Sequence, residues 1–377
     1  MNRRDFLKSL GALPLLHLLP ASVEAGQKQR CVVLVELKGG NDSLNTLVPY
    51  QDAAYYRLRP QLALREQQVL PLGNGMGLHP AMQPLLPLWR NGEMAWIQGV
   101  GIPGQNLARS HFTSIHTWDT ASEDQHSQQG WLSRVFPEQA QHLQGVVIGD
   151  ELGPLAGGHF NAVNLHDIDA FAAYISSLPA VPTHSSNPML AHILATQQRL
   201  LNAGAEVSHK LKGNQAIKQQ FPKGAFGEGL ASIARLILSD FNMPVYKIGL
   251  GNFDTHVSQP NLHQKLLGEL ANGLAAFSKV MQAHGKWGDV MVLSYSEFGR
   301  RAAENHNMGT DHGSAAAHFA IGGGVKGGMY GTHPDLDALN EGDVRNSLDF
   351  RSLYASLARR WWQRSSPWPV ADIPFIA

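Results

Sequence analysis

The chain has 377 residues, of which 43% are apolar and 16% charged, a balance typical of a globular protein with a large core. Equal numbers of basic and acidic residues give a formal net charge of zero, which argues against a nucleic-acid partner. The single cysteine, Cys31, excludes an intramolecular disulfide bond.

The N-terminus has the form of an export signal. The pair Arg3-Arg4 precedes a modest apolar stretch, as in a twin-arginine signal. The stretch is shorter than the roughly 20 residues that span a bilayer, and its end favours cleavage after Ala25. We therefore expect a signal peptide at 1–25, the twin-arginine export machinery as a partner, and a periplasmic or secreted protein without a stable membrane anchor. An ordinary amphipathic helix is the alternative.

The mature chain, residues 26–377, predicts one α/β domain. Continuous apolar or β-branched runs predict strands at 31–37, 94–100, 145–149, 245–251, 290–295 and 318–321. Helical spacing predicts helices at 110–120, 227–241, 262–284 and 352–362. This alternation predicts a doubly wound, mostly parallel central sheet with helices on both faces. A region at about 186–241, which includes a polar, Gln-rich part, is expected to form a helical insertion.

Four short polar clusters lie at or soon after the ends of predicted strands, at 39–43, 252–256, 296–300 and 309–313. The carboxyl ends of parallel strands share one edge of the sheet, and ligand sites form there. We therefore expect these clusters to converge on one crevice. Their Asp, His, Glu and Ser side chains suit a divalent cation and a nucleophile.

The first two clusters supply three candidate metal ligands. Asp42 follows two glycines that allow a sharp turn, and a carboxylate there suits a hard or borderline cation, although an Asx turn or helix cap is the alternative. Asp254 and His256 are two apart on an extended segment and so point to the same side. A loop hydrogen-bond network is the alternative for this pair.

The last two clusters supply three more. Asp311 and His312 are adjacent on a glycine-bounded turn, from which both can reach one cation. Glu297 is either a ligand or the structural partner of Arg300. The guanidinium fork of that arginine suits recognition of a tetrahedral oxyanion. His318 is a further candidate, although a lone histidine more often packs in a core or faces solvent.

Ser110 opens a predicted helix. Backbone N–H groups and the helix dipole favour anions at that position, which suits a nucleophile attacking phosphorus or sulfur. A plain N-cap is the alternative. His111, the next residue, is a ligand, a base or a surface residue.

Six segments together resemble an exported bacterial family called domain of unknown function 1501, namely 39–50, 109–112, 253–256, 296–300, 309–313 and 322–328. That family is similar to the alkaline phosphatase and sulfatase clan. The clan implies a central sheet, commonly two divalent metals, and a Ser, Thr or modified Cys nucleophile at a helix N-terminus. Its members hydrolyse or transfer phosphate and sulfate esters, whereas the family itself has no assigned activity.

The resemblance implies roles for particular residues. Asp42 resembles the carboxylate after the clan's first strand, and Ser110 resembles the nucleophile. The pair Asp254 and His256 resembles the first metal site, and the pair Asp311 and His312 resembles the second.

The sequence departs from the clan's pattern in three places. The phosphatase branch usually spaces the Asp and His of the first pair by four residues, and here the spacing is two. The late histidine ligand has only His318 and His333 as candidates. Cys31 lacks the context of a formylglycine sulfatase.

The sequence therefore predicts an exported metal-dependent hydrolase or transferase acting on a small-molecule or polymer ester of phosphate or sulfate. Ser110 would be its nucleophile, and Arg300 would hold the oxyanion. Zinc, manganese, magnesium or calcium would bind among the six candidate ligands. The alternative is a non-catalytic exported binding or assembly protein that keeps the fold.

Overall fold

The computed structural model describes residues 30–104, 109–138, 143–149, 151–170, 215–239 and 243–377, with a few positions between 173 and 201. The predicted signal peptide and much of the predicted helical insertion lie outside these residues.

A nine-stranded sheet forms the centre of the described part of the chain, in the order β11-β5-β10-β9-β1-β8-β6-β7, with β12 beside β5. Neighbouring strands pair in parallel except β10, which is antiparallel to both β5 and β9. The predicted mostly parallel sheet is therefore confirmed. The strands are β1 (Cys31–Leu37), β5 (Met94–Gly101), β6 (Gly145–Ile148), β7 (Ala162–Leu165), β8 (Val245–Leu250), β9 (Val290–Tyr295), β10 (Ala316–Gly322), β11 (Gly328–Gly331) and β12 (Leu348–Asp349).

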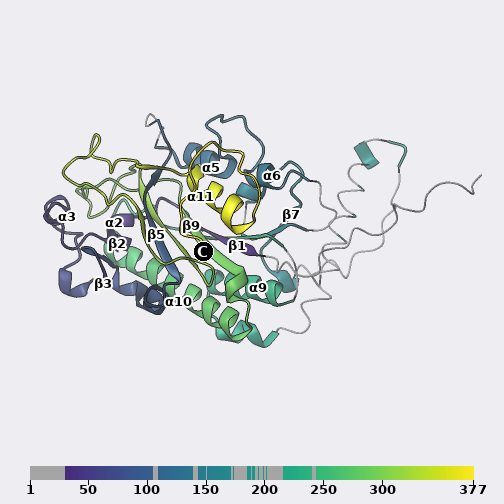
Figure 1. Ribbon diagram of the computed structural model, residues 1–377, viewed down its shortest axis with the longest axis horizontal. Helices are drawn as coiled ribbons and strands as arrows, with labels where there is room; N and C mark the ends of the chain where they lie inside the picture. The colour runs from purple at the N-terminus through teal and green to yellow at the C-terminus, as the bar shows by residue number, and fades with distance from the viewer. Residues whose placement is uncertain are drawn as a thin grey trace, which may run out of the picture.

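Helices cover both faces of this sheet (Figure 1). One face carries α9 (Ala225–Leu238), α10 (Gln259–Ala283), α4 (Leu86–Arg90) and the turns η2 (Pro80–Leu85) and η4 (Gln215–Gln220). The other face carries α5 (His111–Thr120), α6 (Leu132–Val135), α11 (Arg351–Ser356), η3 (Gly153–Leu155) and the π-helical turn η6 (Leu357–Trp361).

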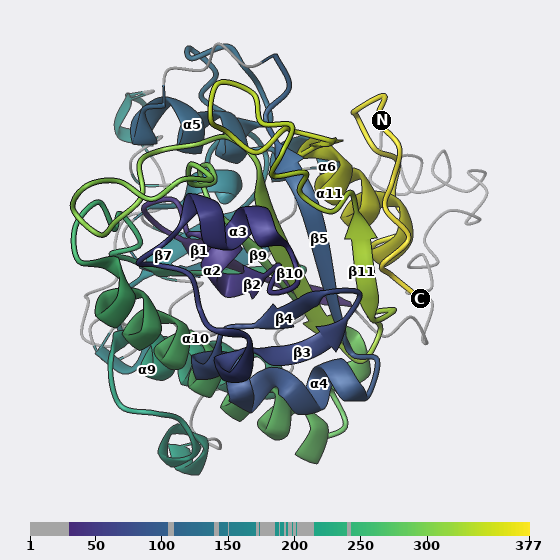
Figure 2. The same cartoon turned by 90° about the vertical axis from the view of Figure 1, so that its left-hand side faces the viewer.

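A small second sheet lies beside the large one, in the order β2-β4-β3 (Figure 2). Its strands are β2 (Leu47–Val48), β4 (Met76–Leu78) and β3 (Leu70–Gly73). The short elements α2 (Ser43–Thr46), α3 (Ala53–Leu58), η1 (Glu66–Gln68) and η5 (Trp287–Asp289) complete the described fold. None of the three small strands is predicted from the sequence, because they are too short for a clear periodic pattern.

The alternation of side chains along β1 explains why helices cover both faces of the sheet. Val33 and Val35 pack into the apolar cluster under α9 and α10, while Val32 and Leu34 pack into the cluster under α5 and α11. Successive strand residues point to opposite faces, so a run without polar interruption needs helices on both sides. The strand β1 is therefore buried along its whole length.

The six predicted strands and four predicted helices are all present, with ends shifted by a few residues. The direction of β10 is the main feature that the sequence pattern does not give. The helix α9 lies within the predicted insertion at 186–241 and packs against the sheet.

His318, a candidate ligand in the sequence, lies on β10 inside the core. Its ring packs edge-on against Trp118, with the ring centroids 5.2 Å apart. Burial lowers the pKa of His318 to about 3, because a charged imidazole would lose its hydration there. His318 is therefore a neutral core residue and not a metal ligand.

This burial predicts a pH-dependent stability. Between pH 6.5 and about 3 the unfolded chain binds a proton at this position and the folded chain does not, so stability falls as pH falls through that window. The wild-type protein should lose unfolding free energy when the pH falls from 7 to 4.5. We expect this loss to be about 2–3 kcal/mol smaller in His318→Phe, since each pKa unit is worth about 1.4 kcal/mol. Urea unfolding at the two pH values measures the change.

The exposed His126 provides the control, because His126→Phe should leave the pH dependence of wild type unaltered. Equal pH slopes in wild type and His318→Phe would contradict a buried neutral imidazole at this position.

Candidate metal centre and active site

The loops that follow β1, β8 and β9 meet at the carboxyl edge of the sheet. Phe253 N–H donates to the carbonyl of Lys38 over 3.0 Å, which joins the first two loops. Gly313 N–H donates to the carbonyl of Gly299 over 2.8 Å, which joins the third loop to the segment 309–314. The predicted convergence of the four polar clusters is therefore present.

Two glycines make this close approach possible. Gly39 has φ +110°, and a Cβ there would lie 2.5 Å from the backbone nitrogen of Asp254. A Cβ on Gly309 would lie 2.2 Å from the backbone of His256. Any larger residue at either position would push the loops apart.

Arg300 holds these loops together from inside. Its guanidinium is buried and donates to the carbonyls of Gly39, Gly40, Phe253 and Thr310 and to the carboxylate of Asp254 at 2.6 Å. Every N–H-bearing nitrogen of the group is thus engaged by the protein. The prediction that this arginine reads a substrate oxyanion does not fit its position, and the structure gives it a positioning role.

Three histidines surround Asp254, and each has its Nδ1 held by an oxygen. The Nδ1 atoms of His111, His256 and His312 lie 2.9 Å from Glu297 Oε1, 3.2 Å from Asp311 Oδ1 and 2.7 Å from the carbonyl oxygen of Arg109. A carbonyl or carboxylate oxygen only accepts, so each Nδ1 is the protonated nitrogen that donates. In the neutral rings, the Nε2 atoms therefore carry the lone pairs.

These Nε2 atoms point at Asp254 and at one another. His256 Nε2 and His312 Nε2 are 2.9 Å apart, and they lie 3.0 Å and 3.1 Å from Asp254 Oδ1. His111 Nε2 lies 3.5 Å from Asp254 Oδ2. Ligand atoms of His111, Asp254 and His312 all fall within 4.8 Å of one another.

The arrangement brings the Nε2 lone pairs of the histidines close to the carboxylate oxygens of Asp254, with too few protons to form a hydrogen bond at every contact. Burial lowers the pKa of His312, which favours its neutral ring. Burial raises the pKa of Asp254, but the hydrogen bond and the positive charge of Arg300, together with the neighbouring histidines, outweigh this and bring it to about 2. An ionised carboxylate and imidazole lone pairs at such distances repel unless a positive charge lies among them.

A divalent cation fits this set of donors. Around a tetrahedral zinc with bonds of about 2.1 Å, ligand atoms are about 3.4 Å apart. The Nε2 atoms of His256 and His312 lie 2.9–3.1 Å from each other and from Asp254 Oδ1, and the ligand atoms of His111, Asp254 and His312 lie within 4.8 Å of one another. Histidines that bind metals through Nε2 commonly donate their Nδ1–H to a carboxylate or a backbone carbonyl, as all three do here. His111, Asp254, His256 and His312 are therefore the residues that could hold a metal.

The predicted ligands thus separate into groups. Asp254, His256 and His312 lie in the cluster, whereas Glu297 and Asp311 contact imidazoles and orient them. Asp42 is fully buried and pairs with Arg59 at 2.6 Å, and in the described part of the chain no hydrogen bond or ion pair joins it to the three histidines. His111, which the sequence left open as a ligand, base or surface residue, belongs to the cluster.

A buried polar chain links Asp42 to the ligand loops. Gln259 donates from Nε2 to Asp42 Oδ2 at 2.5 Å. Its Oε1 accepts hydrogen bonds from the hydroxyls of Thr255 at 3.0 Å and Thr310 at 2.7 Å. Thr255 lies between Asp254 and His256, and Thr310 precedes Asp311, so one amide fixes both ligand-bearing loops.

Ser110 is the N-cap of α5 and is half-buried. Its side chain makes no capping hydrogen bond, unlike the plain N-cap considered from the sequence. The hydroxyl is therefore not committed to the helix. His111, the next residue, places this helix end beside the histidine cluster.

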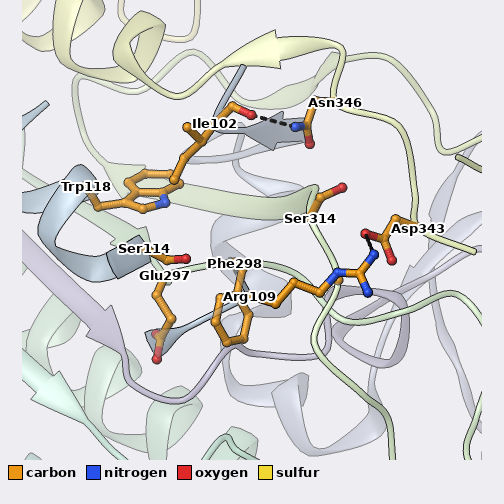
Figure 3. Close-up of a pocket in the computed structure, with 10 residues that line it drawn as sticks. Ile102, Arg109, Ser114, Trp118, Glu297, Phe298, Ser314, Asp343 and Asn346 are labelled. Carbon is orange, nitrogen blue, oxygen red and sulfur yellow. Dashed lines mark hydrogen bonds and ion pairs between the residues drawn. The ribbon is translucent and has the colours of Figure 1, made fainter. Parts of the chain in front are cut away.

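A small pocket adjoins the cluster (Figure 3). Glu297 and Phe298 line it and also contact His111. Its cavity of about 40 Å³ has room for a few water molecules or a small group. Arg109, whose side chain is 37% exposed, lines the pocket and pairs with Asp343 at 3.0 Å. The sequence analysis did not single out this arginine as a site residue.

Comparisons with known proteins agree with the sequence resemblance. A family model described as "Protein of unknown function (DUF1501)" matches residues 185–360. No curated protein sequence matches the chain.

Three solved structures are similar to this chain at low identity. The PsFucS1 sulfatase from Pseudoalteromonas sp. is 11% identical with a TM-score of 0.40, over 89% of this chain and 68% of that one. The soluble domain of lipooligosaccharide phosphoethanolamine transferase A from Neisseria meningitidis is 10% identical with a TM-score of 0.39, over 89% and 88%. A protein of the alkaline phosphatase superfamily from Vibrio parahaemolyticus is 10% identical with a TM-score of 0.37, over 82% and 64%.

Within the described residues, no helix has both the length and the apolar character that crossing a membrane requires.

The hydrogen bond between Gln259 and Asp42 can be tested by moving the negative charge from residue 42 to residue 259. Gln259→Glu places a second buried carboxylate against Asp42, and we expect it to lower the unfolding free energy by about 3–5 kcal/mol. The double variant Asp42→Asn with Gln259→Glu again has one carboxylate facing Arg59, and it should recover most of this loss. Chemical denaturation measures both, and a double variant no more stable than the single one would contradict the link.

Proposed function

We propose that this chain, whose residues 185–360 match the DUF1501 family model, is an exported metal-dependent hydrolase or transferase of phosphate or sulfate esters. The observation that carries the proposal is the convergence of three imidazole Nε2 atoms on the carboxylate of Asp254. The arginine pair of the N-terminal sequence supports export by the twin-arginine route.

The residues of the centre suit one divalent cation. His111, Asp254, His256 and His312 would hold it, and Glu297 and Asp311 would orient two of the imidazoles. When bound, such a cation polarises a phosphoryl or sulfuryl oxygen and offsets the charge that develops on it. Asp42, paired with Arg59, would take no part in binding.

Ser110 is our candidate nucleophile. Its hydroxyl lies at the N-terminus of α5, where unpaired backbone N–H groups and the helix dipole favour the anionic form of an attacking oxygen. Because the hydroxyl caps no helix N–H, attack would not disrupt the helix end.

Arg109 is our candidate for the oxyanion role that the sequence pattern predicts for Arg300. It is partly exposed at the pocket beside the centre, whereas Arg300 is buried. The ion pair with Asp343 fixes the direction of the Arg109 side chain, and the remaining guanidinium N–H groups are suited to nonbridging oxygens of an ester.

Metal binding is the first expected outcome. The mature protein should bind about one equivalent of zinc or manganese, because one set of ligands converges. His111→Ala and His312→Ala should each lower the affinity by about 100-fold or more, given that loss of an orienting partner alone costs about 10- to 100-fold. His333→Ala, at an exposed position, is the matched control. Metal titration by calorimetry with elemental analysis checks this, and two tightly bound equivalents would contradict it.

Turnover is the second expected outcome. Metal-loaded protein should hydrolyse a generic phosphate or sulfate ester, and a chelator should abolish that activity reversibly. Ser110→Ala should lower kcat by about 10⁴-fold or more, as loss of a nucleophile does in well-studied hydrolases. Protein that binds the metal but turns over no ester, with Ser110→Ala indistinguishable from wild type, would favour the non-catalytic binding protein instead.

A further inference from the structure

Large apolar side chains are exposed next to the candidate centre. Phe112 is 87% exposed, Val257 is 60% exposed and Met308 is 42% exposed. Phe112 follows His111, Val257 follows His256, and Met308 lies three residues before Asp311. Only six large apolar side chains are exposed in the part of the chain that the structure describes, so half of them flank the centre. Exposure of this kind is informative when it is clustered.

Backbone and ring contacts place these residues on two sides of the centre. The backbone N–H of Gln259 donates to the carbonyl of Met308 over 2.8 Å, so the segment after Val257 runs beside Met308. The ring of His312 lies between the other two imidazoles, with centroids 4.7 Å from His256 and 4.5 Å from His111. Phe112 therefore lies on one side of the centre, and Val257 and Met308 lie on the other.

The loops hold this arrangement at a conformational cost. Ser258 and Met308 have φ values of +50° and +56°, in the left-handed region that residues other than glycine seldom adopt. Such conformations persist where surrounding contacts enforce them and are concentrated at functional sites. The hydrogen bonds between the two loops enforce them here.

The position of these side chains restricts what can cover them. A permanent protein partner on all three would also cover the half-exposed carboxylates of Asp254 and Asp311 between them. An anionic membrane surface is disfavoured by these two carboxylates and by a net charge of zero. A substrate that binds for one turnover and then leaves neither covers the carboxylates permanently nor requires an anionic surface.

We propose that Phe112, Val257 and Met308 bind an apolar group of the substrate, so that the substrate class is an ester with an alkyl or aryl chain beside its anionic group. This inference rests on the proposed function only for the anionic group of the substrate. The anion would lie at the centre between Arg109 and His312, and the chain would lie across the exposed side chains. Burial of each methylene from water strengthens binding by about fourfold when complete and less when partial.

The test uses methylphosphonate and butylphosphonate, whose P–C bonds resist hydrolysis. Their affinities for the zinc-loaded mature protein are measured by calorimetry. We expect butylphosphonate to bind about 10-fold or more tightly than methylphosphonate, since three more methylenes each contribute about two- to fourfold. In Phe112→Ser and Val257→Ser the ratio of the two affinities should fall to about one to three. The ratio is the readout because it cancels any effect of a variant on the anion site.

Met189→Ser provides the control, because Met189 is 76% exposed but not adjacent in sequence to any residue of the centre. It should retain the wild-type ratio. An unchanged ratio in Phe112→Ser and Val257→Ser, or no chain dependence in wild type, would overturn the inference and leave the proposed function standing. If neither phosphonate binds with or without zinc, the proposed function fails and the inference fails with it.

Other occupants give distinct results. If wild type shows no chain dependence but sediments with phosphatidylcholine vesicles, and Phe112→Ser does not, the inference is overturned in favour of a membrane. If wild type shows no chain dependence but forms a dimer in solution, and Phe112→Ser does not, it is overturned in favour of a second copy of the chain.

Discussion

The structure of the site depends on one electrostatic constraint. Three imidazoles donate their Nδ1–H groups outward, to Glu297, to Asp311 and to a backbone carbonyl, so their Nε2 lone pairs turn inward to Asp254. At most one of His256 and His312 can carry a proton at Nε2, because two N–H groups cannot face each other across the 2.9 Å between these atoms. A cation among the four groups gives every inward lone pair a partner at once.

The rest of the loop architecture supports this arrangement. Arg300 binds four backbone carbonyls and Asp254, which ties the loops after β1, β8 and β9 into one unit. Beneath it, Gln259 joins Asp42 to the threonines of both ligand-bearing loops. Most of these buried polar groups are satisfied by one another, which makes their geometry well defined, although Asp42 Oδ1 has no hydrogen-bond partner among the described residues. The ligand loops are therefore preorganised by residues outside the set of four candidate ligands.

Much of the fold follows from the sequence, and so does the convergence of the polar clusters. The uninterrupted β-branched run of β1 predicts a strand covered on both faces, and parallel pairing then brings its end beside those of β8 and β9. The roles of single residues follow less well. An arginine in a strand-end loop has the same sequence signature whether its guanidinium faces a substrate or backbone carbonyls, so the sequence of Arg300 and its neighbours does not distinguish the two roles. Asp42 is similar, because its partner Arg59 lies beyond α3, at a distance that no local pattern encodes.

The most direct test of the account is a crystal structure of the zinc-loaded mature protein with anomalous diffraction recorded at the zinc edge. The account predicts one strong anomalous peak within about 2.0–2.2 Å of the Nε2 atoms of the cluster histidines and a carboxylate oxygen of Asp254. A peak beside Asp42, or no peak among His111, His256 and His312, would contradict it.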